Sequence, residues 1–463
     1  MKIFILLFIF LLTIHITFQT ETLMSHNEET NLEATREATE ILEKIAKKVI
    51  NIDKGTNNDG QEELIRRSNL FEGDIVLTPS QAENVVAEVV EKVESSGFDI
   101  SDIVNETHIR RKRTIDNTTY LKWDFPILYY VSQKVDASKI EKALKNIENE
   151  TCIRFKKTEN KSQDKPGLFY FNDGDCYSSI GRLYDHKLQE ISIAENCDTI
   201  GTIIHETMHA LGSHHEQSRA DRNDYLTVLM SNVEEGFENN FFKTDFSDTI
   251  SYDVPYDYGS DMHYRTNAFS KNGEPTMLPT DPLYKKTIGV DAGLSFLDAK
   301  LLNKHYCMDK CTKSITCYNG GYVDPNNCLK CKCISGFEGN DCSKMPDDSM
   351  ECGDAVHEVE KNKTVRLYKR GKGDCIYHIK SKTNSTLKII VNEITYYPGF
   401  KSTCNLDNSV EIKYYNDKSV TGALFCLSEK NKTITAQGHH VIVHHRSTQG
   451  TNFLFMQFEN IEK

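Results

Sequence analysis

The sequence HETMHALGSHH occupies residues 205–215 and contains the spacing H-E-x-x-H. His205 and His209 are four residues apart, so a helix presents both imidazoles on one face to a single ion. Gly212 can adopt a positive φ that ends the helix, and the chain beyond it can then return His215 as a third nitrogen ligand. Three imidazoles leave one corner of a tetrahedral metal open for water, which is typical of catalytic rather than structural zinc sites.

Two further features of this motif agree with a zinc-dependent hydrolase. Glu206 follows the first histidine and is well placed to accept the proton of a zinc-bound water. An apolar stripe at helical spacing would anchor the helix in a core, and it consists of Ile200, Ile204, Met208 and Leu211. A helix with incidental histidines is the alternative, but H-E-x-x-H followed by Gly and a third His at fixed offsets is too specific for it. The motif therefore predicts a zinc endopeptidase of the metzincin clan.

The composition of the chain excludes other classes of protein. Its 463 residues include 55 Lys and Arg against 68 Asp and Glu, a net charge of −13, which argues against a nucleic-acid or anionic-membrane binder. The apolar run near the N-terminus is shorter than the ~20 residues of a membrane span, so residues 1–20 are interpreted as a secretory signal peptide. Sequons of the type N-x-S/T support export, and they lie at Asn105, Asn117, Asn149, Asn160, Asn362, Asn384 and Asn431.

The positions of the cysteines divide the rest of the chain into segments that differ in cysteine content and sequence pattern. Residues 21–113 contain no cysteine, show amphipathic helical patterns and end in the basic sequence RRKR at residues 110–113. Residues 114–307 mix alternating and helical patterns, which predicts an α+β domain. Six cysteines crowd into residues 311–342, a segment that needs disulfides to fold. Residues 351–463 contain β-rich runs that predict a sandwich.

Beyond the third histidine the chain resembles the astacin family. Residues 216–225 read EQSRADRNDY, similar to the family signature, and residues 260–264 read SDMHY, similar to its S-x-M-H-Y motif. The resemblance implies that Met262 forms the turn beneath the zinc. It also implies that Tyr264 is an extra zinc ligand that swings away to stabilise the oxyanion. Taken alone, Met262 is a core residue and Tyr264 a surface aromatic, and only their distance from the histidine motif favours these roles.

The sequence FEGDI at residues 71–75 is similar to the pro-segment motif of the family. The resemblance implies that Asp74 takes the open zinc position and keeps the zymogen inactive until a basic-residue convertase cuts after Arg113. The alternatives are an ordinary turn residue at Asp74 and a solvated basic loop at residues 110–113. A thiol switch is excluded because residues 21–113 contain no cysteine.

Two positions near the site leave questions open at the level of sequence. In the family the new N-terminus, here Thr114, turns inward to the acidic residue after the third histidine, here Glu216, and a glycan on Asn117 would prevent this. His214 stands where the family usually has a large apolar or aromatic residue. We expect its imidazole to face solvent, with competition for the metal as the alternative.

The resemblance extends to the C-terminal half of the chain. Residues 308–343 are similar to an EGF-like module and residues 351–463 to a CUB domain, in a domain order similar to that of nematode astacins. Within the CUB-like region we interpret Asp407 as a turn residue rather than a calcium ligand. The six cysteines of the EGF-like segment allow many connectivities by sequence alone. The resemblance implies the disulfides Cys152–Cys307, Cys176–Cys197, Cys311–Cys328, Cys317–Cys331, Cys333–Cys342, Cys352–Cys375 and Cys404–Cys426.

Together these features predict a multidomain, secreted zymogen with one Zn²⁺ per subunit, which hydrolyses internal peptide bonds of extracellular proteins such as matrix or cuticle components. An extended substrate is expected to pair with an edge strand at residues 187–193. A second hypothesis is an adhesive protein with a vestigial protease, against which the intact His205, Glu206, His209 and His215 argue. A third, another metzincin subfamily, is disfavoured by Glu216, Tyr264 and the absence of a pro-segment thiol.

Overall fold

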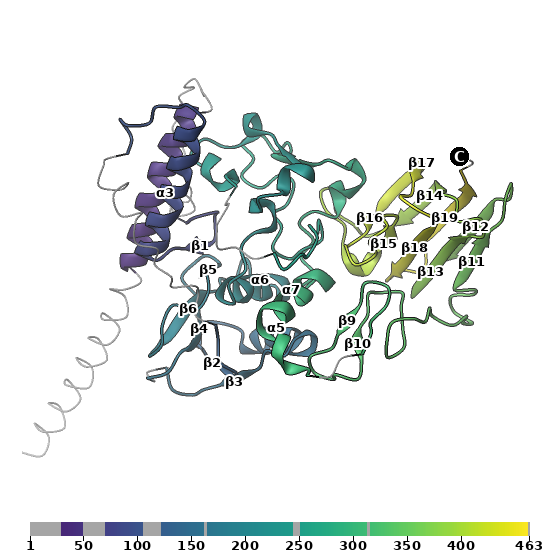
Figure 1. Cartoon of the computed structure of the whole chain (residues 1–463), viewed down its shortest axis with the longest axis horizontal. Helices are drawn as coiled ribbons and strands as arrows, with labels where there is room; N and C mark the ends of the chain where they lie inside the picture. The colour runs from purple at the N-terminus through teal and green to yellow at the C-terminus, as the bar shows by residue number, and fades with distance from the viewer. Residues whose placement is uncertain are drawn as a thin grey trace, which may run out of the picture.

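The structure is a computed structural model that describes residues 29–49, 70–104, 122–161, 164–243, 251–312 and 315–461. A helical hairpin, an α+β domain, a disulfide-rich segment and a β-sandwich follow one another along the molecule (Figure 1). The predicted signal peptide, the sequons at Asn105 and Asn117 and the RRKR sequence lie outside the described residues. Within the described ranges, no helix combines the length and apolarity that a membrane span requires.

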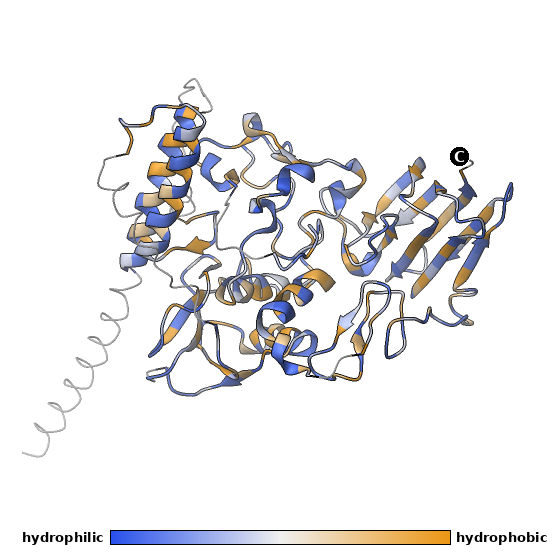
Figure 2. Cartoon of the chain, viewed as in Figure 1, coloured by the Kyte–Doolittle hydropathy of each residue, from blue (hydrophilic) through white to orange (hydrophobic). Residues whose placement is uncertain are grey.

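The N-terminal helical hairpin pairs a helix over residues 29–49 with α3 (Pro79–Ser95). Polar and apolar residues alternate along both helices, as their amphipathic patterns predict (Figure 2). The apolar side chains Leu42, Ile45 and Val85 meet in one buried cluster. A capping box between Thr78 and Gln81 starts α3.

The α+β domain contains a six-stranded sheet in the order β1-β5-β6-β4-β2-β3. The strands are β1 (Ile75–Val76), β2 (Ile127–Val131), β3 (Phe155–Lys157), β4 (Gly167–Phe171), β5 (Tyr177–Ser179) and β6 (Leu188–Ser192). Strands β2, β3, β4 and β6 are parallel, whereas β5 runs antiparallel to β6. The first strand, β1, comes from the segment before residue 113 and pairs in parallel with β5, Ile75 opposite Ser178.

This topology corrects the expectation that residues 187–193 form an edge strand. They contain β6, which is paired on both sides, with β4 and with β5. The chain folds back after β5 as a hairpin, so β5 lies outside β6 and becomes the edge of the sheet formed by residues 122–192. In this structure β1 occupies that edge.

Helices of the α+β domain are α5 (Ala137–Glu150), α6 (Ile200–Ala210) and α7 (Phe296–Tyr306). The predicted apolar stripe of Ile200, Ile204, Met208 and Leu211 lies along α6 and ends at its C-cap, Leu211. Ile140, Ile204 and Met208 are fully buried in one cluster with residues of the sheet. Thr199 caps the N-terminus of α6 by accepting a hydrogen bond from the backbone N–H of Thr202. This packing fixes the helix that carries the H-E-x-x-H motif.

Between the third histidine and α7, the described residues 216–243 and 251–295 form mostly loops and short 3₁₀ turns. A small antiparallel pair joins β7 (Leu226–Val228) to β8 (Met277–Pro279). The 3₁₀ turns of the described chain are η2 (Glu216–Ser218), η3 (Arg222–Asp224), η4 (Met230–Asn232), η5 (Glu238–Phe241), η6 (Pro282–Lys286), η7 (Met308–Lys310) and η8 (Leu406–Asn408).

The disulfide-rich segment and the sandwich complete the described chain. The segment has one short hairpin, β9 (Tyr322–Val323) with β10 (Cys331–Lys332). The sandwich has a five-stranded sheet, β11-β13-β18-β15-β16, and a four-stranded sheet, β12-β19-β14-β17. Its strands are β11 (Val356–Val359), β12 (Val365–Arg370), β13 (Gly373–Ser381), β14 (Leu387–Tyr396), β15 (Ser409–Lys413), β16 (Ala423–Phe425), β17 (Leu427–Thr435), β18 (His440–Ser447) and β19 (Phe453–Asn460).

Seven disulfides staple the fold, and their pairs are the ones that the resemblance implies. They are Cys152–Cys307, Cys176–Cys197, Cys311–Cys328, Cys317–Cys331, Cys333–Cys342, Cys352–Cys375 and Cys404–Cys426. No cysteine is left free in the described chain. The three bridges within residues 311–342 hold a segment with little regular structure, as expected for a module too small for a core of its own.

Candidate active site

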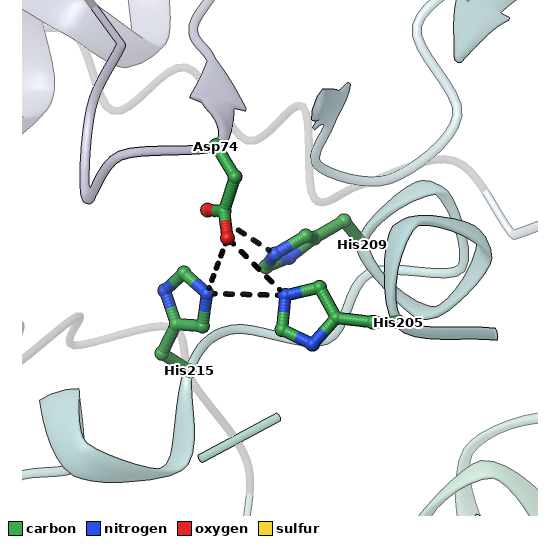
Figure 3. A group of neighbouring side chains, drawn as sticks. All are labelled: Asp74, His205, His209 and His215. Atoms are coloured by element: carbon green, nitrogen blue, oxygen red, sulfur yellow. Dashed lines mark hydrogen bonds and ion pairs between the residues drawn. The ribbon is translucent and has the colours of Figure 1, made fainter. Parts of the chain in front are cut away.

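Helix α6 positions the first two histidines of the motif, and the turn after it positions the third. His205 and His209 project from the same face of α6 towards His215 (Figure 3). Gly212 has φ +101°, a conformation that L side chains rarely adopt, and it ends the helix as its sequence position predicts. The backbone N–H of Ser213 then donates to the carbonyl oxygen of Met208 at 2.9 Å, which closes the turn.

Three imidazoles and one carboxylate converge on a single point. The Nε2 atoms of His205 and His215 are 3.3 Å apart. Oδ2 of Asp74 lies 3.3 Å from Nε2 of His205 and 3.2 Å from Nε2 of His215, and Oδ1 lies 3.7 Å from Nε2 of His209 (Figure 3). Of the His, Cys, Asp and Glu residues that the structure describes, these four form the one group of three or more close enough to share a metal ion.

The hydrogen bonds made by the Nδ1 atoms of His205 and His209 determine the protonation state of their Nε2 atoms. Nδ1 of His205 donates to the carbonyl oxygen of Asp261 at 2.7 Å, and Nδ1 of His209 donates to that of Ser213 at 2.8 Å. Because a carbonyl only accepts, these two rings carry their proton on Nδ1 and direct the lone pair of Nε2 at the common centre. Nε2 of His209 has no hydrogen-bond partner among the described residues. A cation satisfies such a set of converging lone pairs.

Burial and the two nearby carboxylates shift the pKa values of the cluster in different directions. Burial lowers the pKa of His209 to about 4, which keeps this ring neutral at pH 7, as a metal ligand must be. At His215 burial is outweighed by the charges of Asp74 and Glu72, which raise its pKa to about 10. Burial opposes ionisation of Asp74, yet the histidines, above all His215, hold its pKa well below the usual range. The residues present therefore fit a divalent cation held by nitrogen and oxygen ligands.

A second carboxylate from the segment before β1, Glu72, also reaches the cluster, which the sequence does not predict. Its side chain is only 1% exposed, and its Oε2 accepts a hydrogen bond from Nδ1 of His215 at 2.6 Å. Glu72 and Gly73 both have positive φ, 48° and 78°. A Cβ on Gly73 would lie 2.4 Å from Cζ of Phe269, so only glycine permits this approach. Beyond the FEGDI motif itself no local signal marks this contact, because Glu72 reaches His215 only through the tertiary fold.

Glu206 lies beside the converging histidines. Its side chain is 2% exposed, and within the described chain its Oε2 has no hydrogen-bond partner. Burial, together with the charges of Asp74 and Asp261, raises its pKa well above the usual value of a glutamate. Glu206 lines a cleft of about 370 Å³ whose wall also includes Asp74, His205 and Tyr264. A buried carboxylate without a partner, next to an open cleft, is suited to exchange protons with a bound molecule.

Met262 and Tyr264 of the S-x-M-H-Y motif both lie close to the segment that carries the third histidine. Met262 is buried in the cluster that contains Met208, and its carbonyl oxygen accepts from the backbone N–H of Glu216 at 2.9 Å. The ring of Tyr264 faces that of His215, with 4.7 Å between centroids. Its hydroxyl donates a hydrogen bond to the carbonyl oxygen of Glu72, so the segment that carries Asp74 also binds this phenol.

Both residues that flank His215, His214 and Glu216, have polar side-chain atoms shielded from solvent. Glu216 is held by the backbone N–H of Asp257, at 2.8 Å, and by Arg219, and burial raises its pKa to about 8. Its expected partner Thr114 lies outside the described residues.

The expectation that His214 faces solvent is wrong, because both its ring nitrogens are buried. The hydrogen bonds of the adjacent residues to α6 and to the Met262 turn draw this segment inward. His214 is not part of the converging group.

Three nitrogen ligands with a buried carboxylate beside them define a mononuclear metal site of the kind found in zinc peptidases. Residues 115–307 match the family model described as Astacin, a peptidase family. The chain is 33% identical over 389 residues to zinc metalloproteinase nas-34 of Caenorhabditis elegans, and the match covers 83% of this chain and 63% of that protein. It is 31% identical over 401 residues to nas-36 of Brugia malayi, covering 82% and 68%.

Among solved structures, high choriolytic enzyme 1, a hatching enzyme zinc-protease from medaka (Oryzias latipes), is 33% identical with a TM-score of 0.36, and the match covers 40% of this chain and 93% of that chain. The chain belongs to the astacin family. Its relatives are zinc metalloproteinases, so the ion that suits the site is Zn²⁺. The chain spans 63% of nas-34 and 50% of nas-37 of C. elegans.

Proposed function

We propose that this chain is the secreted zymogen of a zinc endopeptidase that cleaves internal peptide bonds of extracellular proteins once a basic-residue convertase has cut after Arg113. The observation that carries the proposal is the convergence of the Nε2 atoms of His205, His209 and His215 around a carboxylate from the segment before that cut, with Glu206 buried beside them. An adhesive protein with a decayed protease has no need for this arrangement.

Two contacts support inhibition by the pro-segment, residues 21–113. Asp74 takes the position on the histidines that a catalytic site keeps open for water. Strand β1 covers the edge strand β5, on which an extended substrate is expected to add as a further strand. Removal of one segment therefore frees both the open metal position and the sheet edge.

In the active form the chemistry is divided among a few side chains. A bound Zn²⁺ supplies Lewis acidity, which polarises the scissile carbonyl and acidifies a water molecule. Glu206 accepts the proton of the attacking water on its carboxylate and returns it to the leaving amide nitrogen. The hydroxyl of Tyr264 loses its bond to Glu72 when the pro-segment leaves and becomes available to donate to the developing oxyanion. The bonds from His205 to Asp261 and from His209 to Ser213 hold these two rings in place.

The C-terminal half supports a location outside the cell. We assign residues 308–343 to an EGF-like module, on the basis of three closely spaced disulfides, and residues 351–463 to a CUB domain, on the basis of the two-sheet sandwich. Fourteen cysteines in seven bridges fit an oxidising compartment. Exposed side chains are available for glycosylation at Asn149, Asn160, Asn362, Asn384 and Asn431. Asp407 is an exposed residue of the η8 turn, in line with its interpretation as a turn residue.

Cleavage of casein by the purified full chain tests the proposal. We expect no hydrolysis before treatment with a basic-residue convertase, hydrolysis after it, and a fall to background when a zinc chelator is added. Activity should return when Zn²⁺ is restored, since the imidazoles remain intact. The matched control is an Arg113→Gln chain, which the convertase should leave inactive. Hydrolysis that persists in excess chelator would show that the histidine cluster is not the catalytic centre.

A further inference from the structure

The β-sandwich, residues 351–461, makes a dense polar contact with the α+β domain. Figure 1 shows strands β15 and β16 next to the loops that precede α7. Asp281 accepts from the hydroxyls of Tyr414 and Tyr415 at 2.6 and 3.0 Å. Thr287 accepts at its hydroxyl from the backbone N–H of Leu424 at 2.9 Å. Such a set of directed bonds differs from the few contacts of a tethered module.

Apolar packing continues across the same surface. Tyr284 of η6 is 1% exposed, and its ring lies 4.6 Å from Tyr258 on its own side and 5.3 Å from Tyr415 of the sandwich, between centroids. Buried residues of the α+β domain and of the sandwich, among them Tyr258 and Ile412, belong to one hydrophobic cluster. The two domains therefore share a core instead of meeting at two separately finished surfaces.

One residue of the sandwich reaches the loop behind the active site. The backbone N–H of Thr421 donates to Oδ1 of Asp257 at 3.0 Å, and its hydroxyl donates to Oδ2 at 3.1 Å. Asp257 is 2% exposed, so these bonds lie in a dry interior where they are strong. A Cβ on Gly259 would lie 2.5 Å from Cγ2 of Thr421, so the glycine permits the close approach.

Asp257 in turn holds the segment that follows the third histidine. Its backbone N–H donates to Oε1 of Glu216 at 2.8 Å, and Glu216 directly follows His215. The backbone N–H of Glu216 donates to the carbonyl oxygen of Met262 at 2.9 Å. A short series of hydrogen bonds thus connects Thr421 with both the third histidine and the turn beneath the cluster.

Thr421 is itself fixed by a buried ionic group within the sandwich. The next residue, Gly422, donates from its backbone N–H to Oε1 of Glu411 at 2.8 Å, and Nζ of Lys413 donates to the carbonyl oxygen of Val420 at 2.6 Å. Glu411 is 3% exposed and also accepts from Arg446 at 2.7 Å. The loop that carries Thr421 is therefore anchored on both sides and cannot easily follow a displaced Asp257.

We propose that the sandwich is a fixed part of the catalytic unit and that Thr421 is a positioning residue for the His215–Glu216 segment, acting through Asp257. The catalytic side of this inference rests on the proposed peptidase function, whereas the docking of the two domains does not. Neither Thr421 nor Asp257 lines the cleft beside Glu206. Loss of the Thr421 hydroxyl should therefore lower the rate of the chemical step and the affinity for the metal ion, and leave substrate binding unchanged.

Three single variants of the full chain, cut after Arg113, test this inference. Thr421→Val removes the donor and keeps the size of the side chain, Thr421→Ser keeps the donor, and Thr435→Val is the control at an exposed position of β17. For Thr421→Val we expect kcat to fall about tenfold with KM unchanged, as for loss of a hydrogen bond to a buried charged group. We also expect faster zinc release to a chelator and a lower temperature of a single unfolding transition. Thr421→Ser and Thr435→Val should behave like the wild type.

Zinc release and unfolding are measured independently of peptide hydrolysis, so they report on Thr421 even if the chain proves to have no peptidase activity. Gly259→Ala provides a second test. Its added methyl group should displace Thr421 and lower the temperature of the same unfolding transition. The proposal is overturned if the wild type unfolds in two separate transitions, if Thr421→Val matches Thr435→Val in kcat, zinc release and unfolding, or if Thr421→Ser is as impaired as Thr421→Val.

Discussion

Glu206→Gln is expected to abolish peptide hydrolysis in the chain cut after Arg113 while zinc remains bound. Glutamine has nearly the shape of glutamate but cannot accept a proton from water at neutral pH. Glu206 is buried beside the histidines and does not belong to the group that converges on the metal. Metal binding should therefore survive the substitution. Loss of a positioned base costs about 10²- to 10⁴-fold in rate.

The measurement is kcat/KM on a peptide substrate, together with zinc content per chain. Glu195→Gln is a matched control, because Glu195 is exposed close to the start of α6. It should leave both quantities unchanged. A Glu206→Gln enzyme that retains more than about a tenth of the wild-type rate would show that another group takes the proton. Loss of zinc from that variant would instead show that Glu206 supports the metal.

Asp74→Asn is expected to make the uncut chain active. The charge-assisted contacts of Asp74 with the three histidines are mostly shielded from solvent, since the Asp74 side chain is 20% exposed, and contacts of this kind contribute about 3 kcal/mol. Their loss should raise the activity of the uncut chain about 100-fold over that of the uncut wild type. Strand β1 and the contact between Glu72 and His215 remain, so the activity should stay below that of the cut enzyme.

Peptide hydrolysis by the uncut variant, with intact chain length verified by mass spectrometry, measures this effect. Asp99→Asn is the control within the same segment, because Asp99 is exposed. If the uncut Asp74→Asn chain is as inactive as the uncut wild type, but fully active after the cut, inhibition is due to β1 and Glu72 instead. The expected increase in peptide hydrolysis would show that inhibition is due mainly to the carboxylate of Asp74.

The parts of the fold that depend on local spacing can be predicted from the sequence. His205 and His209 share a helix face because of the helical repeat, and Gly212 marks the end of α6 because few other residues adopt its φ. The disulfide pairs, Met262 and Asp74 depend on resemblance to a family, since nothing in their spacing along the chain places them together. The structure contains these disulfide pairs and places Asp74 against the three histidines.

The remaining features depend on contacts between distant segments. The alternation of residues 187–193 predicts a strand, but a sheet edge is defined by which neighbour is missing, and here β5 lies outside β6. The burial of His214 follows from the bonds of the residues beside it, which no local pattern reveals. Glu72 contacts His215 across 143 residues of sequence and Thr421 contacts Asp257 across 164, and no local signal in the sequence marks either contact.

Anomalous X-ray scattering at the zinc edge, recorded from crystals of the uncut full chain, would locate the metal ion. We expect one zinc ion per chain, within about 2.1 Å of the Nε2 atoms of His205, His209 and His215 and with a carboxylate oxygen of Asp74 in its coordination sphere. A crystal without stoichiometric zinc at these three imidazoles, or with zinc bound only elsewhere in the chain, would contradict this expectation.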